Sequence, residues 1–249
     1  MNPEGRIAGS LSAVRARIAG AALRAGRRPG DVTLIGISKT MPAEAVQEAV
    51  AAGLADLGEN RVQEADAKIP AVRPGPTPLT WHLVGRLQQN KARRAVALFP
   101  WIHSIDSVPL AQRIDRIAGE IGARPSLLVE VSLAGEAAKG GIAPGELGLL
   151  LEAMGGLSHA RLAGLMAIPP HSAQGQTAEG SRPWFRKLRE LQDTWRLRGY
   201  DLPALSMGMT DDFEIAIEEG ATHVRVGRAL FGERPAAAEP AGTEGTARR

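Results

Sequence analysis

Short apolar runs, many of them rich in β-branched residues, recur along the chain and alternate with segments of helical period. Eight runs have the length of a strand and lie at residues 32–38, 54–58, 81–85, 101–105, 126–132, 161–168, 202–208 and 222–227. Runs that are apolar at almost every position are typical of strands buried on both faces. Stretches such as 42–53 and 211–220 repeat their apolar residues with a helical period, so the pattern predicts strands and helices in alternation.

This alternation predicts an α/β fold built on a parallel sheet. Eight strand-and-helix units in 249 residues favour a single (β/α)8 TIM barrel. A doubly wound open sheet has the same alternation and is the competing architecture. An extra amphipathic helix is predicted over 6–26, ahead of the first strand, where it would cap or flank the barrel. Its apolar face would consist of Ile7, Leu11, Val14, Ile18 and Ala22.

We expect one domain, a barrel over residues 1–234, followed by a disordered tail over 235–249. The tail combines Ala, Pro, Gly and charged residues without an apolar period. The Arg-rich N-terminal segment could imitate a transit peptide, but its clean helical period favours an ordinary helix.

Composition excludes several kinds of site and partner. The absence of cysteine excludes disulfides, thiolate metal ligands and cysteine nucleophiles. The formal net charge is only +3, and acidic residues are interleaved with the basic ones, so we expect no nucleic-acid partner. No apolar stretch has the roughly 18 residues of a membrane span. We therefore expect a cytoplasmic protein without a membrane partner. The five histidines lack HxxxH or HxH spacing, and we assign no metal site.

Lys39 ends the first predicted strand, where the side chains that perform chemistry in a barrel gather. The other four lysines fall in predicted helices or polar loops. Partial desolvation at a strand end lowers the pKa of an amine and frees it for attack on a carbonyl group. The alternative is a lysine that extends from the strand end into solvent.

Small residues end the seventh and eighth predicted strands. Ser206, Gly208 and Gly227 precede the loops that form the usual phosphate site of such barrels, where backbone amides can approach an anion closely. A glycine after a strand is also common in an ordinary turn, so each segment alone is ambiguous. Thr210 is expected to cap a helix that begins with Asp211.

Arg225 is predicted to face the barrel interior, because alternation along the eighth strand directs Val224 and Val226 toward the helices. A buried guanidinium needs an acceptor, which could be a carboxylate of the protein or a ligand. An amine, a phosphate cradle and an inward arginine match the aldehyde, the phosphate and the ring nitrogen of pyridoxal 5'-phosphate (PLP).

Several segments together resemble one family of proteins. They are SKTMPAEAVQEAVAAG, GEN, VQEA, WHLVGRLQQNK, HSIDS, GLMAIPP and LSMGMTDDFEIAIEEGATHVRVGRALFG. In these segments the chain resembles the pyridoxal phosphate homeostasis proteins, from about residue 5 to 234. The resemblance implies an alanine-racemase-like (β/α)8 barrel and PLP as the cofactor.

The same resemblance implies roles for individual residues. Lys39 would carry PLP as an internal aldimine, Asn60 would lie near the ring, and Arg225 would face the pyridine nitrogen. The phosphate would be bound by Ser206, Gly208, Gly227 and Arg228. The chain departs from the family's usual pattern at Arg86, where His is frequent, and at Arg228, where Thr is frequent. At position 228 only the backbone amide or the guanidinium could then contact the phosphate.

These features favour a PLP carrier that contributes to vitamin B6 homeostasis, without catalytic residues. An arginine facing the pyridine nitrogen disfavours its protonation. Racemisation also needs a second acid or base, which related racemases take from a tyrosine of a further domain. The sole tyrosine here is Tyr200, between a predicted helix and strand. The rivals are a PLP-dependent racemase or lyase and a Schiff-base aldolase. We expect transient transfer of PLP to apo-enzymes and, without a second domain, a monomer.

Overall fold

The computed structural model describes residues 5–134, 140–170 and 177–232, and the predicted tail 235–249 lies outside them. Eight parallel strands form a closed barrel in chain order, in which β1 pairs with both β2 and β8. The strands are β1 (Thr33–Ile37), β2 (Asp56–Glu59), β3 (Thr80–Leu83), β4 (Trp101–Ile105), β5 (Ser126–Glu130), β6 (Arg161–Met166), β7 (Ala204–Met209) and β8 (His223–Val226). Each overlaps one of the eight predicted runs. Closure confirms the barrel and excludes the open sheet.

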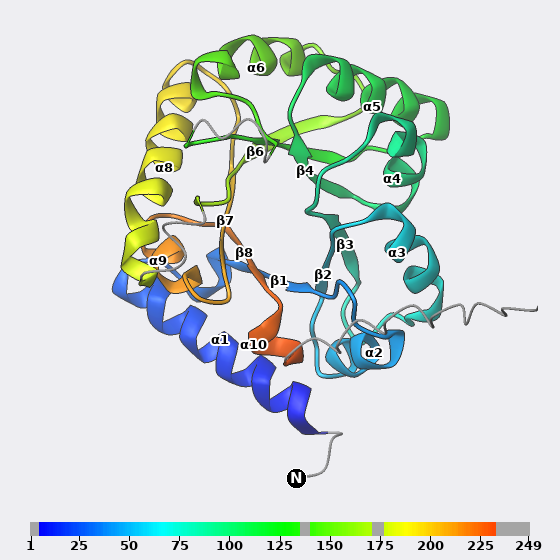
Figure 1. The fold of residues 1–249 in the computed structure, drawn as a ribbon, viewed down its shortest axis with the longest axis vertical. Coiled ribbons are helices and arrows are strands. Elements are labelled where there is room, and N and C mark those ends of the chain that lie inside the picture. The colour runs from blue at the N-terminus through cyan, green and yellow to red at the C-terminus, as the bar shows by residue number, and fades with distance from the viewer. Residues whose placement is uncertain (1–4, 135–139, 171–176, 233–249) are drawn as a thin grey trace, which may run out of the picture.

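Helices surround the strands as an outer ring, as Figure 1 shows from one end of the molecule. Within the described part of the chain they are α1 (Arg6–Arg24), α2 (Ala43–Ala51), α3 (Val62–Lys68), α4 (Ala92–Leu98), α5 (Val108–Ile121), α6 (Leu147–Gly155), α8 (Arg182–Leu197), α9 (Phe213–Glu218) and α10 (Arg228–Phe231). Short 3-10 turns lie at η2 (Pro29–Asp31), η3 (Ile69–Ala71), η4 (Gln89–Lys91), η6 (Pro144–Glu146) and η7 (Ala178–Ser181). None of the described helices is long and apolar enough to cross a membrane.

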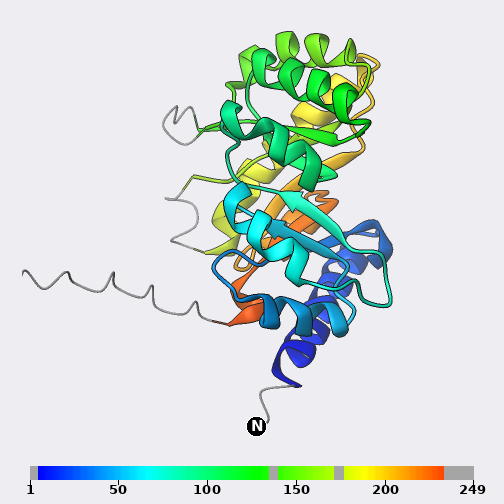
Figure 2. The same ribbon diagram turned by 90° about the vertical axis from the view of Figure 1, so that its right-hand side faces the viewer.

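The N-terminal helix α1 flanks the barrel. It packs against α9, α10 and α2, and so fills the part of the ring that the four-residue α10 leaves open. Figure 2 shows it in blue along the outside of the molecule. The buried residues of α1 include the five that the helical period predicted: Ile7, Leu11, Val14, Ile18 and Ala22. The predicted helix is therefore confirmed.

The main apolar core lies between the strands and the helices. Val224 and Val226 of β8 belong to it, as the predicted alternation requires. A second, smaller apolar cluster consists of Leu128, Met166 and Ala204, with Trp101 packed against them. Much of the remaining interior is polar. Buried histidines, a serine and an arginine occupy it, and this interior lies below the candidate site.

The entry to α9 differs from the expected cap. Asp212, not Thr210, is the residue that precedes the helix, and its carboxylate accepts from Met209 N at 2.7 Å and from Ser181 Oγ at 2.9 Å. Thr210 Oγ1 instead accepts from Gly227 N at 3.4 Å. The threonine thus connects the end of β7 to the end of β8 and was wrongly predicted as a cap.

Candidate functional site

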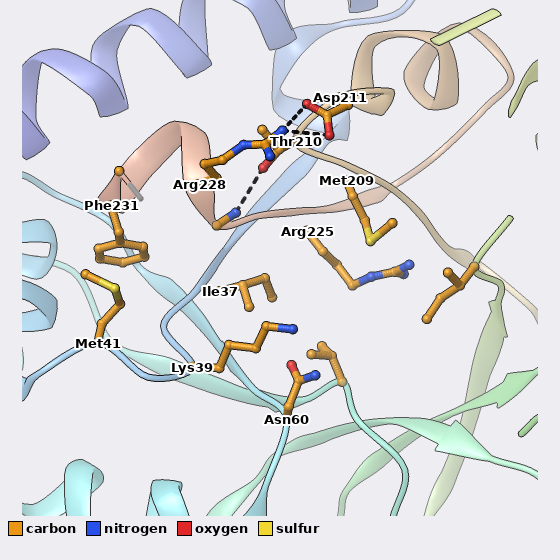
Figure 3. A pocket seen from close by; sticks show the side chains of 14 residues that line it. Ile37, Lys39, Met41, Asn60, Met209, Thr210, Asp211, Arg225, Arg228 and Phe231 are labelled. Carbon is orange, nitrogen blue, oxygen red and sulfur yellow. Dashed lines mark hydrogen bonds and ion pairs between the residues drawn. The ribbon is translucent and has the colours of Figure 1, made fainter. Parts of the chain in front are cut away.

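A cavity of about 510 Å³ opens at the carboxyl ends of the strands, on the side of the barrel where β8, β1 and β2 are neighbours. Figure 3 shows its lining, in which Lys39 and Asn60 face Arg225 across the opening. The polar residues that line it are Lys39, Asn60, Thr210, Asp211, Arg225 and Arg228. Three of them are cations and one is a carboxylate. The cavity is therefore suited to an anion with hydrogen-bond acceptors.

Lys39 is half-buried, and its side chain extends into the cavity (Figure 3). Thr40, directly after it, has a left-handed backbone with φ of 64°. The chain therefore turns sharply at the end of β1, and this turn directs the lysine toward the opening. The alternative of a lysine extended into solvent does not match this position.

A buried ion pair supports the strand end that carries Lys39. Lys68 Nζ donates to Glu59 Oε1 at 2.5 Å and to the carbonyl O of Ser38 at 2.7 Å. Ser38 Oγ donates to the same Glu59 oxygen at 2.7 Å. Burial raises the pKa of the Glu59 carboxyl, and the hydrogen bonds from Lys68 and Ser38 oppose that rise. Because Ser38 precedes Lys39, this network fixes the backbone from which the amine extends.

Sequence reasoning missed Lys68, although a signal was present. Within α3, Lys68 follows Val62 and Ala65 at intervals of three residues, and these three side chains are buried. Three-residue spacing places them on one helix face. A lysine on an apolar face requires a buried partner, which here is Glu59.

Asn60 lines the cavity directly after β2. The end of β3 approaches it closely, since a Cβ added to Gly85 would lie 2.3 Å from the carbonyl O of Asn60. Only glycine allows this approach. Ser104 Oγ donates to the carbonyl O of Gly85 at 2.7 Å and holds the turn in place. The position of the asparagine is thus fixed from two neighbouring strands.

Arg225 faces the barrel interior, as the alternation along β8 predicted, and its side chain reaches the floor of the cavity. Its Nη1 donates to Ser206 Oγ at 2.7 Å and its Nη2 to the carbonyl O of Ala167 at 3.1 Å. Burial lowers its pKa to about 10, and the charges of Asp212 and Glu130 oppose that shift. Both of these acceptors are neutral. The guanidinium therefore brings positive charge to the cavity wall without a direct hydrogen bond to a carboxylate in the contacts described.

The turn from β8 into α10 forms the opposite wall. Gly227 precedes α10 and Arg228 is its first residue, so the first amides of this helix have no acceptor within the helix. The Arg228 guanidinium donates to both carboxylate oxygens of Asp211, at 2.6 and 2.8 Å. Figure 3 shows these contacts beside Thr210. The hydroxyl of Thr210 and the amides at this turn are thus neutral groups at this wall of the cavity that can donate to an anion.

Comparison with known proteins identifies the family. The family model for the N-terminal domain of alanine racemase matches residues 10–235. A pyridoxal phosphate homeostasis protein of Pseudomonas aeruginosa is 46% identical over 229 residues, which cover 92% of this chain and 96% of that protein. The chain belongs to the pyridoxal phosphate homeostasis protein family. The resemblance noted from the sequence motifs is confirmed.

Solved structures agree with this family. PipY of Synechococcus elongatus, in its structure with PLP bound, superposes with a TM-score of 0.79 at 42% identity, over 91% of this chain and 100% of that chain. Its structure without PLP gives a TM-score of 0.81 at 43% identity. Alanine racemase of Clostridium difficile gives 0.68 at 15% identity over 58% of that chain, which shows a shared fold.

Two residues predicted for the phosphate do not line the cavity. Ser206 is fully buried below it, and its hydroxyl contacts Arg225 and His103. Gly208 has φ of 89°, and a Cβ there would lie 2.5 Å from Ala216 Cβ, so its glycine is explained by packing against α9. The pairing of β7 with β8 shifts register between Ser206 and Met209, which brings Thr210 to the cavity. Gly227 and Arg228 line it as expected.

A second, smaller cavity of about 280 Å³ lies beside the first, and Ile168 lines both. Glu130, at the end of β5, lines the smaller one and is 9% exposed. Burial raises its pKa to about 7, despite the opposing charges of Arg225 and Arg86. Arg86 itself is exposed and lies 3.7 Å from Asp106. The sequence does not single out Glu130, because a glutamate at a strand end is equally compatible with a solvated position.

Proposed function

We propose that this protein binds PLP through a covalent link to Lys39 and serves PLP homeostasis as a carrier. The observation that carries the proposal is that Lys39, Arg225 and the turn from β8 into α10 share one cavity. Relatives of 35–46% identity are named pyridoxal phosphate homeostasis proteins. The structure of PipY with PLP bound gives the same ligand for a relative of 42% identity.

The side chains of the cavity fit PLP by their chemistry. When bound, PLP supplies an aldehyde that condenses with a primary amine, together with a phosphate group and an aromatic ring nitrogen. The only lysine among the lining residues described is Lys39. The donors at the far wall, from Thr210 and the turn at Gly227, suit the phosphate. We assign the ring to the space between these two groups, beside Asn60.

Arg225 determines the electronic state of the ring in this arrangement. A fixed positive charge beside a pyridine nitrogen disfavours protonation of that nitrogen. An unprotonated ring withdraws electrons weakly from a bound amine. Arg225 therefore holds the cofactor and reduces its reactivity, as suits a carrier.

Catalysis of racemisation would need an acid or base in addition to Lys39. Tyr200 does not serve, because its ring packs edge-on against Trp195 of α8, at 5.5 Å between centroids, away from the cavity lining. Glu130 supports the competing function of a PLP-dependent racemase or lyase, since its pKa of about 7 suits proton transfer. Exchange of the α-deuterium of labelled amino acids in the presence of PLP-loaded protein would establish that function.

The absorption spectrum tests the carrier directly. Purified protein incubated with PLP and desalted should be yellow, and borohydride should make the attachment permanent. Lys39→Ala should abolish the colour, whereas Lys187→Met, at an exposed position of α8, should retain it. A colourless wild type after incubation contradicts the proposal. Transfer to apo-enzymes is tested by mixing loaded protein with an apo-enzyme and measuring recovered activity.

A further inference from the structure

A chain of hydrogen bonds crosses the barrel interior below the cavity. Asp56 Oδ1 lies 3.0 Å from His82 Nε2, and His82 Nδ1 lies 3.0 Å from His103 Nε2. His103 Nδ1 lies 2.9 Å from Ser206 Oγ, which accepts from Arg225 Nη1 at 2.7 Å. The chain thus joins residues of β2, β3, β4, β7 and β8 and links Arg225 to Asp56, whose side chain is 27% exposed.

Both histidines in this hydrogen-bond chain lie in the barrel interior, where burial favours their neutral forms. His82 is 1% exposed and His103 is fully buried, and burial lowers the pKa of each below its ordinary value. A neutral imidazole has one donor and one acceptor nitrogen. Each ring therefore donates at one end of its hydrogen-bonded path and accepts at the other.

The two ends of the chain fix its direction. An ionised Asp56 only accepts, so the proton of His82 lies on Nε2 and its Nδ1 must accept. His103 then donates through Nε2 to His82, and its Nδ1 accepts the hydroxyl proton of Ser206. The reverse order would place a bare His82 Nε2 against a carboxylate oxygen at 3.0 Å, with no proton between them.

We propose that Asp56, His82 and His103 are positioning residues that act through Ser206 on Arg225. With its proton directed to His103, the Ser206 hydroxyl presents a lone pair to the guanidinium and anchors it without a carboxylate. Arg225 keeps its charge, and its remaining donors are available to the cavity. Ser206, the residue that the sequence assigned to phosphate binding, is in this account part of the support below the ligand.

Other charged and aromatic groups lie near this hydrogen-bond chain, but none takes the place of one of its hydrogen bonds. His223 of β8 lies near both rings, but its Nδ1 contacts Thr222 Oγ1 at 2.8 Å. Trp101 stacks on His82, at 5.8 Å between centroids, and the Arg161 guanidinium lies over the Trp101 ring. Glu130 and Asp212 act on Arg225 through their charges alone. The hydrogen-bond partners of His82 and His103 described above therefore all belong to the hydrogen-bond chain.

Nitrogen NMR of the full-length protein without ligand tests the direction of the chain. The sequence has only five histidines, so the side-chain signals of 15N-labelled protein are few. His82 is assigned by its contact with Trp101. We expect His82 and His103 both to be neutral and to carry the proton on Nε2 at pH 7. Protonation of either ring, or a proton on Nδ1 of either, overturns the proposal.

A variant at the exposed end tests whether the chain transmits an effect. Asp56→Ala should shift the nitrogen signals of His103, whose own hydrogen bonds go to His82 and Ser206. Asp115→Ala is the matched control, because Asp115 is also half-buried and also accepts hydrogen bonds. Its donors are the backbone amides of His159 and Ala160, each at 2.7 Å, and not a histidine ring. Unchanged His103 signals in Asp56→Ala, or in Asp56→Asn if the first variant does not fold, contradict transmission.

A last arm rests on the proposed function. Ser206→Ala removes one of the two acceptors of Arg225, the other being the carbonyl O of Ala167, and should weaken PLP binding by about tenfold. Unchanged affinity would refute the role of Ser206 in positioning Arg225. Failure of the wild type to bind PLP would refute the proposed function. The histidine signals of the unliganded protein would still test the direction of the hydrogen-bond chain.

Discussion

Replacing Lys68 by methionine tests the support below Lys39. Lys68 and Glu59 are 9% and 0% exposed, and 2.5 Å separates Lys68 Nζ from Glu59 Oε1. Methionine has a similar length but no charge, so the Glu59 carboxylate loses its cation. Removing one partner of a buried pair costs about 3–5 kcal/mol. For a domain of this size about 1 kcal/mol lowers the melting temperature by about 2–4 °C, so we expect a decrease of about 6–20 °C at pH 8.

The loss should depend on pH, because the Glu59 carboxyl has a pKa raised by burial. A carboxyl with a raised folded-state pKa contributes stability below its unfolded pKa, and this contribution is lost as pH rises through the folded pKa. Without Lys68 the folded-state pKa rises further. The stability difference from the wild type is therefore largest at pH 8 and smaller at pH 5, because a lower pH favours the neutral form of Glu59 in the folded Lys68→Met variant.

Thermal melts followed by circular dichroism at both pH values measure this difference. Lys187→Met, at an exposed lysine of α8, controls for loss of a positive charge. The double variant with Glu59→Gln should recover most of the stability, because no carboxylate is then left buried. A Lys68→Met melting temperature within about 2 °C of the wild type at pH 8, or an equal loss at both pH values, would refute the reasoning.

Three further outcomes are expected. Glu130→Gln should stabilise the protein at pH 8 by up to about 3 kcal/mol, because the folded wild type must ionise a carboxyl whose pKa is raised from 4.5 to about 7. Denaturant titrations should show that this gain in stability disappears at pH 4.5. Thr210→Ala should weaken PLP binding about tenfold, measured by absorbance titration, without changing the binding of phosphate-free pyridoxal. Arg228→Ala should weaken PLP binding less than Thr210→Ala does, because the Arg228 guanidinium already bonds Asp211 and the backbone amide remains; a larger effect would place the guanidinium on the phosphate.

The fold was predictable because each strand of the barrel appears in the sequence as an apolar run. Strands covered on both faces lack polar positions, and the helices between them have a clear period, so strand number and order follow from the sequence. The inward side of Arg225 followed from alternation along four regular residues of β8. Lys39 followed from its place at the end of an apolar run.

The rest of the site depends on contacts between distant residues. Ser206 and Gly208 were assigned to the phosphate as small residues at the end of a strand and by the family resemblance, but the register shift beside β8 brings Thr210 to the cavity instead. A bulge of this kind leaves no mark in the apolar pattern. His103 and Ser206 are 103 positions apart in the chain, and their contact is visible only once the barrel closes.

Peptide mapping after borohydride treatment tests the covalent link to Lys39 most directly. The protein is incubated with PLP, reduced, digested and examined by mass spectrometry. We expect the added mass of reduced PLP on the peptide that contains Lys39, and an unmodified Lys68, whose amine is held by Glu59 and Ser38. An unmodified Lys39, with the added mass on other lysines or on none, would contradict the assignment of Lys39 as the residue that holds PLP.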